Sequence, residues 1–280
     1  MTPRPFRFGV CLLELGTREQ WRARAREVQD RGYEVLQVPD HLDLPAPFPA
    51  LVAAADVTSI GLGTYGLDAG TLSPAHFARD VADLQRLTFG RLELGLGTGY
   101  RPVEPAPGTP RPDSYGERLT KLEKTLTTTR ELLATEAGVP VPPIMLSGAD
   151  DRMIALGGRE ADIFSFPVRA TVEPGTPPEH AFARRVQMLR EAAGDRFDDI
   201  ELNLFVAAVG DTVDEVDLSA LRQSTGLSDK KLLRLPGVLV GSPRRIAERL
   251  EHYRETFGTT YISVLEPHLA AFAEVIKHLD

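Results

Sequence analysis

The stretch FARDVADLQRLTFGRLELGLGTG, residues 77–99, decides the fold class, because a helical pattern passes into a strand pattern within it. Apolar side chains recur at the spacing of one helix face. This stripe consists of Phe77, Val81, Leu84 and Leu87. Gly90 follows where a left-handed residue ends a helix. The short apolar run Leu92–Leu96 is typical of a buried strand, so the stretch predicts a helix that leads into a parallel sheet.

The same alternation continues in both directions along the chain. Eight short runs of apolar residues are separated by segments of helical period, and this repetition predicts a parallel sheet. The eight predicted strands centre on Phe8–Leu12, Val35–Val38, Ile60–Thr64, Leu92–Leu96, Pro143–Ser147, Asp162–Phe166, Leu202–Ala207 and Tyr261–Leu265. Eight such strands in 280 residues favour a closed (β/α)8 TIM barrel of the α/β class.

Helix ends carry matching signals. Ser73-Pro74 and Ser242-Pro243 each place an N-cap serine before a proline at the first helical position. Gly32 and Gly258, like Gly90, follow helical stretches where a left-handed residue would end them. These positions predict where three of the helices stop and where two begin.

A doubly wound open sheet is the alternative for the same alternation. It needs a glycine-rich phosphate turn after its first strand, whereas Glu14–Thr17 contains a single glycine. No repeat, low-complexity tract or linker divides the chain, so residues 1–280 are predicted to form one domain. Two segments, Tyr100–Asp113 and Val209–Val240, are longer than ordinary connections and are candidate active-site loops.

Composition narrows the class of function. Hydrophobic residues make up 42% of the chain and charged residues 26%, as in ordinary globular proteins. The net charge of −8 argues against nucleic acid and anionic membranes as partners. No apolar run approaches the roughly 18 residues of a membrane span, and the first residues do not resemble a signal peptide. The single cysteine, Cys11, lies in an apolar run and is predicted to be a buried packing residue in a cytoplasmic protein.

Candidate functional residues follow the predicted strands, because barrel enzymes place their sites at the carboxyl ends of strands. Asp40-His41 follows the second strand, and a histidine can act as an acid or a base near neutral pH. The same pair could instead cap the next helix or bond a neighbouring loop. Gly97-Thr98-Gly99 permits close approach of a flat ring or a phosphate, although a tight turn needs the same residues. His268 is the only other histidine close to a strand end.

The turn after the fifth strand is a candidate anion site. Ser147-Gly148-Ala149 precedes a helix and offers backbone N–H groups and a hydroxyl. The next residues, Asp150 and Asp151, suit a helix N-terminus but would repel a phosphate there. The sequence contains no zinc-binding pattern, no Gly-x-Ser-x-Gly elbow and no Walker A loop, so no metal site is predicted.

The order of these motifs resembles the luciferase-like monooxygenase superfamily, most closely its branch of F420-dependent oxidoreductases. The resemblance covers nearly the whole chain, and residues 77–99 are its most specific part. It is also carried by EVQDRGYEVLQVPDH at 27–41, IGLGT at 60–64, GERLTKLEKTL at 116–126 and PIMLSGADDRMIALGGREAD at 143–162.

This resemblance implies a barrel that binds a flavin or deazaflavin at the carboxyl ends of its strands, and a homodimer. The ring would contact Gly63, Thr64 and Tyr65, where the family often has a non-proline cis peptide, and also Gly97, Thr98 and Gly99. The phosphate tail would reach Ser147, Gly148, Ala149 and Asp150. Catalysis would use His41, with Asp40, for proton transfer, and Tyr100 or Tyr115 as a further polar contact.

Three functions remain open on this basis. The first is F420-dependent hydride transfer to or from a small organic molecule, as in secondary metabolism. The second is an FMN-dependent monooxygenase. The third is a non-redox enzyme, catalysing a cyclisation or isomerisation, or a binding protein, on a barrel that has lost its cofactor. The chain departs from its relatives in the acidic turn at Asp150-Asp151, in the shortened insertion at Ala134–Pro142, and in Tyr100, where tryptophan is usual.

Overall fold

The computed structural model describes residues 4–69, 73–99, 113–135 and 138–279. These residues fall into two compact groups. The first group comprises residues 12–27 and 35–146, and the second comprises residues 4–11, 28–34 and 147–279.

The first group is built on parallel strands. They are β2 (Val35–Pro39), β3 (Gly61–Tyr65), β5 (Leu92–Gly97) and β6 (Ile144–Ser147), with the two-residue β4 (Leu67–Asp68). Strand β3 pairs in parallel with both β2 and β5, and β5 pairs in turn with β6. Strand β4 extends the edge of β5 at its carboxyl end. Every residue of β2 and β5 is buried, which explains why these strands are mostly apolar, with Gln37 and Glu93 as buried polar exceptions.

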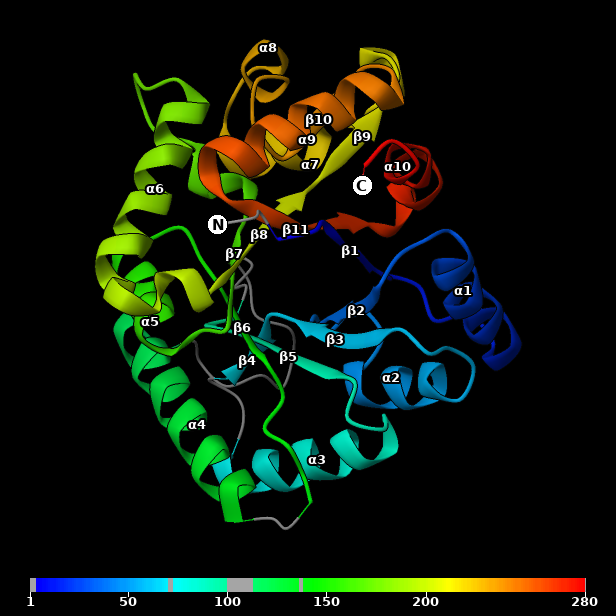
Figure 1. The fold of residues 1–280 in the computed structure, drawn as a ribbon, viewed down its shortest axis with the longest axis vertical. Coiled ribbons are helices and arrows are strands. Elements are labelled where there is room, and N and C mark those ends of the chain that lie inside the picture. The colour runs from blue at the N-terminus through cyan, green and yellow to red at the C-terminus, as the bar shows by residue number, and fades with distance from the viewer. Residues whose placement is uncertain (1–3, 70–72, 100–112, 136–137, 280) are drawn as a thin grey trace. The chain divides into compact units, whose positions relative to one another are not determined.

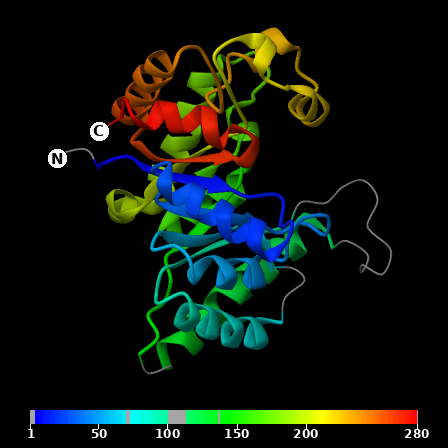
Figure 2. The same ribbon diagram turned by 90° about the vertical axis from the view of Figure 1, so that its right-hand side faces the viewer.

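Helices cover the strands of the first group. They are α1 (Arg18–Asp30), α2 (Pro47–Ala55), α3 (Pro74–Leu87) and α4 (Tyr115–Thr135). Helix α3 packs against α4 (Figure 1), and α2 packs against α3 (Figure 2). The buried Trp21 indole donates a hydrogen bond of 2.9 Å to the Ala50 carbonyl and so joins α1 to α2. The Arg91 guanidinium donates to the carbonyls of Ala55, Thr58 and Ile60 and fixes the entry to β5.

The second group also contains four parallel strands. They are β1 (Arg7–Cys11), β7 (Ile163–Phe166), β8 (Glu201–Val206) and β11 (Thr259–Leu265), in the order β1-β11-β8-β7. A chain of buried hydrogen bonds crosses three of them. The Ser165 hydroxyl donates to the Asn203 side-chain oxygen at 2.7 Å, and the Asn203 amide donates to the Ser263 hydroxyl at 2.9 Å. All three side chains are fully buried, so these bonds satisfy polar groups that would otherwise be costly to bury.

Helices α5 (Asp151–Glu160), α6 (Pro178–Ala193), α9 (Pro243–Phe257) and α10 (Leu269–Ile276) pack in the second group. Short 3₁₀ turns accompany them at η2 (Val168–Thr171), η3 (Gly194–Asp199), η4 (Val213–Glu215) and η5 (Glu266–His268). Helix α5 packs against α6, and α9 against α10 (Figure 1). A Cβ at Gly158 would lie 2.7 Å from Ala192, so the close approach of α5 to α6 requires glycine there.

The segment between β8 and α9 was predicted only as a long connection, but it contains short strands and helices. It contains β9 (Ala208–Gly210), α7 (Ser219–Thr225), α8 (Asp229–Leu232) and β10 (Val238–Val240). Strands β9 and β10 pair in parallel. Leu218, Leu232 and Leu235 belong to a small apolar core of this segment. The long connection predicted over Val209–Val240 therefore contains short helices and strands, each of which buries too few residues to show a period in the sequence.

The eight predicted strands are confirmed, with ends that shift by one or two residues. Gly32, Gly90 and Gly258 have φ values of 86°, 74° and 77°, the left-handed conformation predicted at helix ends. Ser73 and Ser242 stand at the predicted N-cap positions, but neither side chain makes a capping hydrogen bond. Cys11 is 1% exposed, and burial raises the pKa of its thiol, so it is the packing residue expected. Among the described residues, no helix is long and apolar enough to cross a membrane.

Candidate functional site at the strand ends

Asp40 and His41 follow β2, as the sequence predicts. One carboxylate oxygen of Asp40 accepts a hydrogen bond of 3.1 Å from the backbone N–H of Asp68 in β4. The His41 carbonyl accepts a bond of 3.0 Å from the N–H of Leu44, and the imidazole is partly exposed. Asp40 therefore ties the turn after β3 to the end of β2. His41 begins the loop toward α2 and is half-buried.

The end of β3 is fixed by a side chain rather than by an unusual peptide bond. The Thr64 hydroxyl donates to the Gly95 carbonyl at 3.0 Å and accepts from the Gly95 N–H at 2.9 Å. Thr64 is 1% exposed, so this hydroxyl is used in joining β3 to β5. The peptide bonds of 63–65 are trans, and the expectation of a cis bond in this region was wrong. The Thr64–Gly95 pair aligns the two strand ends without one.

Glycine occurs in β5 and in the turn after it for different structural reasons. A Cβ at Gly95 would lie 2.1 Å from the Thr64 carbonyl oxygen, and a Cβ at Gly99 would lie 2.4 Å from the Asp68 carboxylate. Gly95 is therefore required by close packing against backbone atoms, whereas Gly99 is favoured by its φ of 75° because the Asp68 side chain could move aside. Among the described residues, a Cβ at Gly97 would meet nothing closer than 3.8 Å. Packing does not require glycine at position 97, and the methyl-sized space there is a cradle at the strand end.

The N-terminus of α5 is capped by a carboxylate of the protein itself. The Asp150 carboxylate accepts a hydrogen bond of 3.2 Å from the Met153 N–H and caps the helix. Asp151 forms an ion pair of 2.7 Å with Arg185 on α6. A Cβ at Gly148 would lie 2.3 Å from the Met153 side chain, so this glycine serves the packing of the turn. The turn therefore presents a carboxylate where a phosphate would bind, and it does not fit the phosphate of a cofactor.

The remaining predicted positions divide between the described and undescribed parts of the chain. Tyr100 lies outside the described residues. Tyr115 is the first residue of α4, where Arg118 lies 5.8 Å from its ring centroid. His268, beyond β11, pairs through Nε2 with the Ala207 carbonyl at 3.0 Å, and burial lowers its pKa. Asp68 was not predicted, although it is an acidic residue that closely follows a strand, which is the pattern that singled out Asp40.

Comparison with known families agrees with this strand arrangement. The sequence model of the luciferase-like monooxygenase family matches residues 6–228. The chain belongs to this family. Its members are oxidoreductases or monooxygenases, so this luciferase-like protein is an enzyme of that broad type. No curated protein sequence matches the chain.

Solved structures of the same fold extend over the whole chain. The coenzyme F420-dependent tetrahydromethanopterin reductase of Methanopyrus kandleri has 17% identity and a TM-score of 0.78, and the match covers 99% of this chain and 100% of the reductase. An F420-dependent secondary alcohol dehydrogenase has 14% identity and a TM-score of 0.77, with 99% and 98% covered. A riboflavin lyase with modified FMN has 16% identity and a TM-score of 0.73, with 98% and 91% covered. The fold is therefore a luciferase-like (β/α)8 barrel, as predicted.

Proposed function

We propose that this luciferase-like protein is an F420-dependent oxidoreductase that acts on a small organic substrate. Support comes from the family and from the two F420-dependent enzymes that share the fold. The single observation in the chain itself that carries the proposal is the cradle at Gly97, where neither its backbone conformation nor packing against the part of the chain that the structure describes requires glycine. A flat ring is the kind of group for which such a strand end leaves room.

The residues of the first group fit the ring end of a deazaflavin. Gly97 leaves space at the carboxyl end of β5, and Asp40 and Thr64 hold the neighbouring strand ends in fixed positions. When bound, F420 supplies transfer of a hydride to or from carbon. The α5 turn at Ser147–Asp150 does not fit the phosphate, and the proposal assigns it no part in binding.

His41 is the residue of this chain that we assign to proton transfer. A hydride delivered to a carbonyl leaves an alkoxide that needs a proton, and the reverse reaction releases one. His41 is half-buried at the end of β2, and an imidazole has one nitrogen that can donate and one that can accept a proton. Asp40 acts as a positioning residue, since its carboxylate orders the turn that carries Asp68.

The proposal is tested by following the deazaflavin absorbance of protein mixed with oxidised F420 and a panel of small alcohols, or with reduced F420 and the corresponding ketones. We expect turnover with part of the panel, lowered by about 100-fold in His41→Ala because general acid–base catalysis contributes about that much. His76→Ala, on an exposed histidine of α3, is the matched control and should retain full activity. Full activity in a well-folded His41→Ala variant would remove His41 from this role.

A second candidate function is a reaction without a redox cofactor in the same fold. The observation that favours it is the acidic N-terminus of α5, where Asp150 takes the helix N–H group that a phosphate would use.

An FMN-dependent reaction is supported instead by the riboflavin lyase structure, which contains a modified FMN. Absence of binding to both F420 and FMN would favour the non-redox function, and binding of FMN alone would favour the flavin reaction.

A further inference from the structure

A cavity of about 570 Å³ lies in the second group, between the loop after η2 and the α7–α8 segment. Small-molecule sites have volumes of this order. Most of its lining is apolar, including Val172, Pro177, Pro178, Leu227 and Leu235. The loop that forms one wall follows β7 at its carboxyl end, which is where barrel proteins bind their ligands.

Two cations line the cavity without partners. Lys231 and Arg234 are exposed, and among the described residues neither side chain has a hydrogen bond or an ion pair. The chain continues past α8 through a 3₁₀ bond from the Arg234 N–H to the Lys231 carbonyl. Residues three apart in a 3₁₀ turn point to the same side, so both cations face the cavity together.

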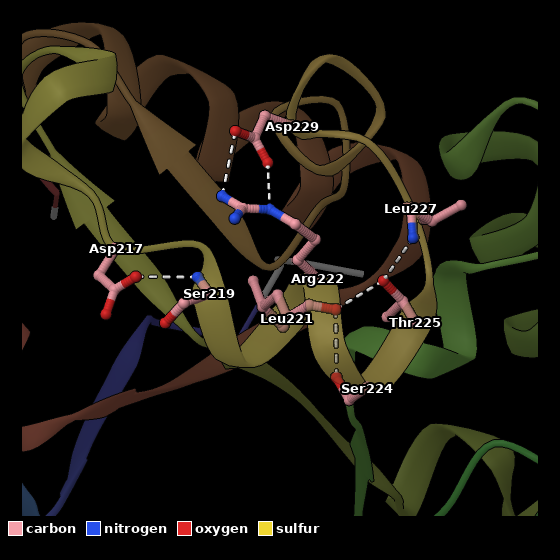
Figure 3. Close-up of polar contacts among 8 residues, drawn as sticks. All are labelled: Asp217, Ser219, Leu221, Arg222, Ser224, Thr225, Leu227 and Asp229. Atoms are coloured by element: carbon pink, nitrogen blue, oxygen red, sulfur yellow. Dashed lines mark hydrogen bonds and ion pairs between the residues drawn. The ribbon is translucent and has the colours of Figure 1, made fainter.

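The other charges around this cavity are neutralised. Glu173, which also lines it, forms an ion pair with Arg184 on α6. Arg222 of α7 is held by Asp229 of α8 at 2.9 Å, as Figure 3 shows. The whole chain has a net charge of −8, so two unpaired cations at one pocket are not a consequence of a basic composition. They leave the pocket with a local positive charge.

The wall that carries the cations is internally fixed. The Thr225 hydroxyl donates to the Leu221 carbonyl at 2.6 Å and accepts from the Leu227 N–H at 3.3 Å, which closes the turn after α7 (Figure 3). Leu232, which lies between the two cations in the sequence, and Leu235, which follows Arg234, are buried in the core of the segment. The pocket is therefore largely preformed, which lowers the entropy cost of binding. Lys231 and Arg234 also lie beyond residues 6–228, the part that the family model matches.

We propose that this pocket binds a small organic anion, with the apolar skeleton against Val172, Leu227 and Leu235 and a terminal carboxylate or phosphate against Lys231 and Arg234. Charge-assisted contacts to the two cations hold the anionic end, and the apolar lining removes the skeleton from water. This inference is independent of the proposed redox function, because every residue of the pocket belongs to the second group and none is assigned to the deazaflavin ring.

The test is calorimetric titration of the full chain, without any cofactor, with octanoate, octyl phosphate and octanol. We expect one-to-one binding of at least one anion, with octanol at least about 10-fold weaker because it lacks the charge-assisted contacts. The double variant Lys231→Gln/Arg234→Gln should weaken anion binding by about 10-fold and leave octanol unchanged. The comparison of octanoate with octyl phosphate identifies which anionic group the pocket prefers.

Lys230→Gln is the matched control, because Lys230 is an exposed lysine of the same helix that does not line the cavity. It should bind the anions like the unaltered chain. All these variants should keep their thermal transition, since they change exposed side chains only. Binding of octanol as tight as that of the anions, unchanged binding in the double variant, or no binding of either anion at millimolar concentration would overturn the proposal.

Discussion

The strand ends of the first group and the α7–α8 pocket use polar residues in opposite ways. At the strand ends, the Asp40 carboxylate and the Thr64 hydroxyl are bonded to backbone groups of the protein, and Gly95 is required by close packing. At the pocket, Lys231 and Arg234 have no partner among the described residues. Residue type alone therefore does not identify a binding position. The informative features are the space left at Gly97 and the charge left at Lys231 and Arg234.

The largest effect that tests this comparison is expected for Gly95→Ala. The added Cβ would lie 2.1 Å from the Thr64 carbonyl oxygen, between two paired strands that cannot easily separate. We expect the free energy of unfolding to fall by about 4 kcal/mol or more, or the chain to fail to fold. Urea denaturation measures this, and a stability close to that of the unaltered chain would show that β5 has room to move.

Thr64→Val should have the next largest effect. The substitution keeps the shape but removes the hydroxyl that bonds both the N–H and the carbonyl of Gly95. We expect a loss of about 2 kcal/mol, because a buried N–H is left without its acceptor. The control is Thr120→Val on the exposed face of α4, which should change the urea midpoint little. Equal effects at the two positions would mean that the Thr64 bonds add nothing specific.

His268→Gln should alter how stability depends on pH. Burial lowers the pKa of His268 from its ordinary value near 6.5, so the folded chain holds this ring neutral while the unfolded chain binds a proton below about pH 6.5. The free energy of unfolding is therefore unaffected by His268 above about pH 6.5. It decreases as the pH falls below that value, because the unfolded chain binds a proton that the folded chain does not, until the pH passes the pKa of His268 in the folded chain. Glutamine does not titrate. Between pH 8 and pH 5 the thermal transition temperature should fall less in the variant than in the unaltered chain. If the two proteins lose stability in parallel, His268 is not a cause of the pH dependence.

The smallest effect on stability is expected for Gly97→Ala, two residues from the position with the largest. The nearest atom to the added Cβ would lie 3.8 Å away, so the urea midpoint should stay nearly unchanged. If the deazaflavin ring uses this space, the same variant should weaken F420 binding by about 10-fold, the size expected when a methyl group fills a close contact. A stable variant with unchanged F420 affinity would show that F420 does not occupy the space at Gly97.

Most of the barrel was predictable because its strands are buried and consist mainly of apolar residues, even where a polar residue such as Glu93 or Asn203 interrupts them. Leu92–Leu96, for example, was found within one residue of β5. The α7–α8 segment was not predictable, since Leu218, Leu232 and Leu235 form a core only after the chain folds back on itself. The roles of Thr64 and Gly95 were missed for the same reason. A reciprocal hydrogen bond between residues 31 positions apart has no local pattern.

Whether this luciferase-like barrel uses F420 is decided by a binding measurement on the purified chain. The chain is titrated with oxidised F420, and separately with FMN, while the fluorescence of the ligand is followed. We expect micromolar, saturable binding of F420, weaker binding of FMN, and a weakened F420 response in Gly97→Ala. Binding of FMN alone, or of neither ligand, by a folded protein would contradict this expectation.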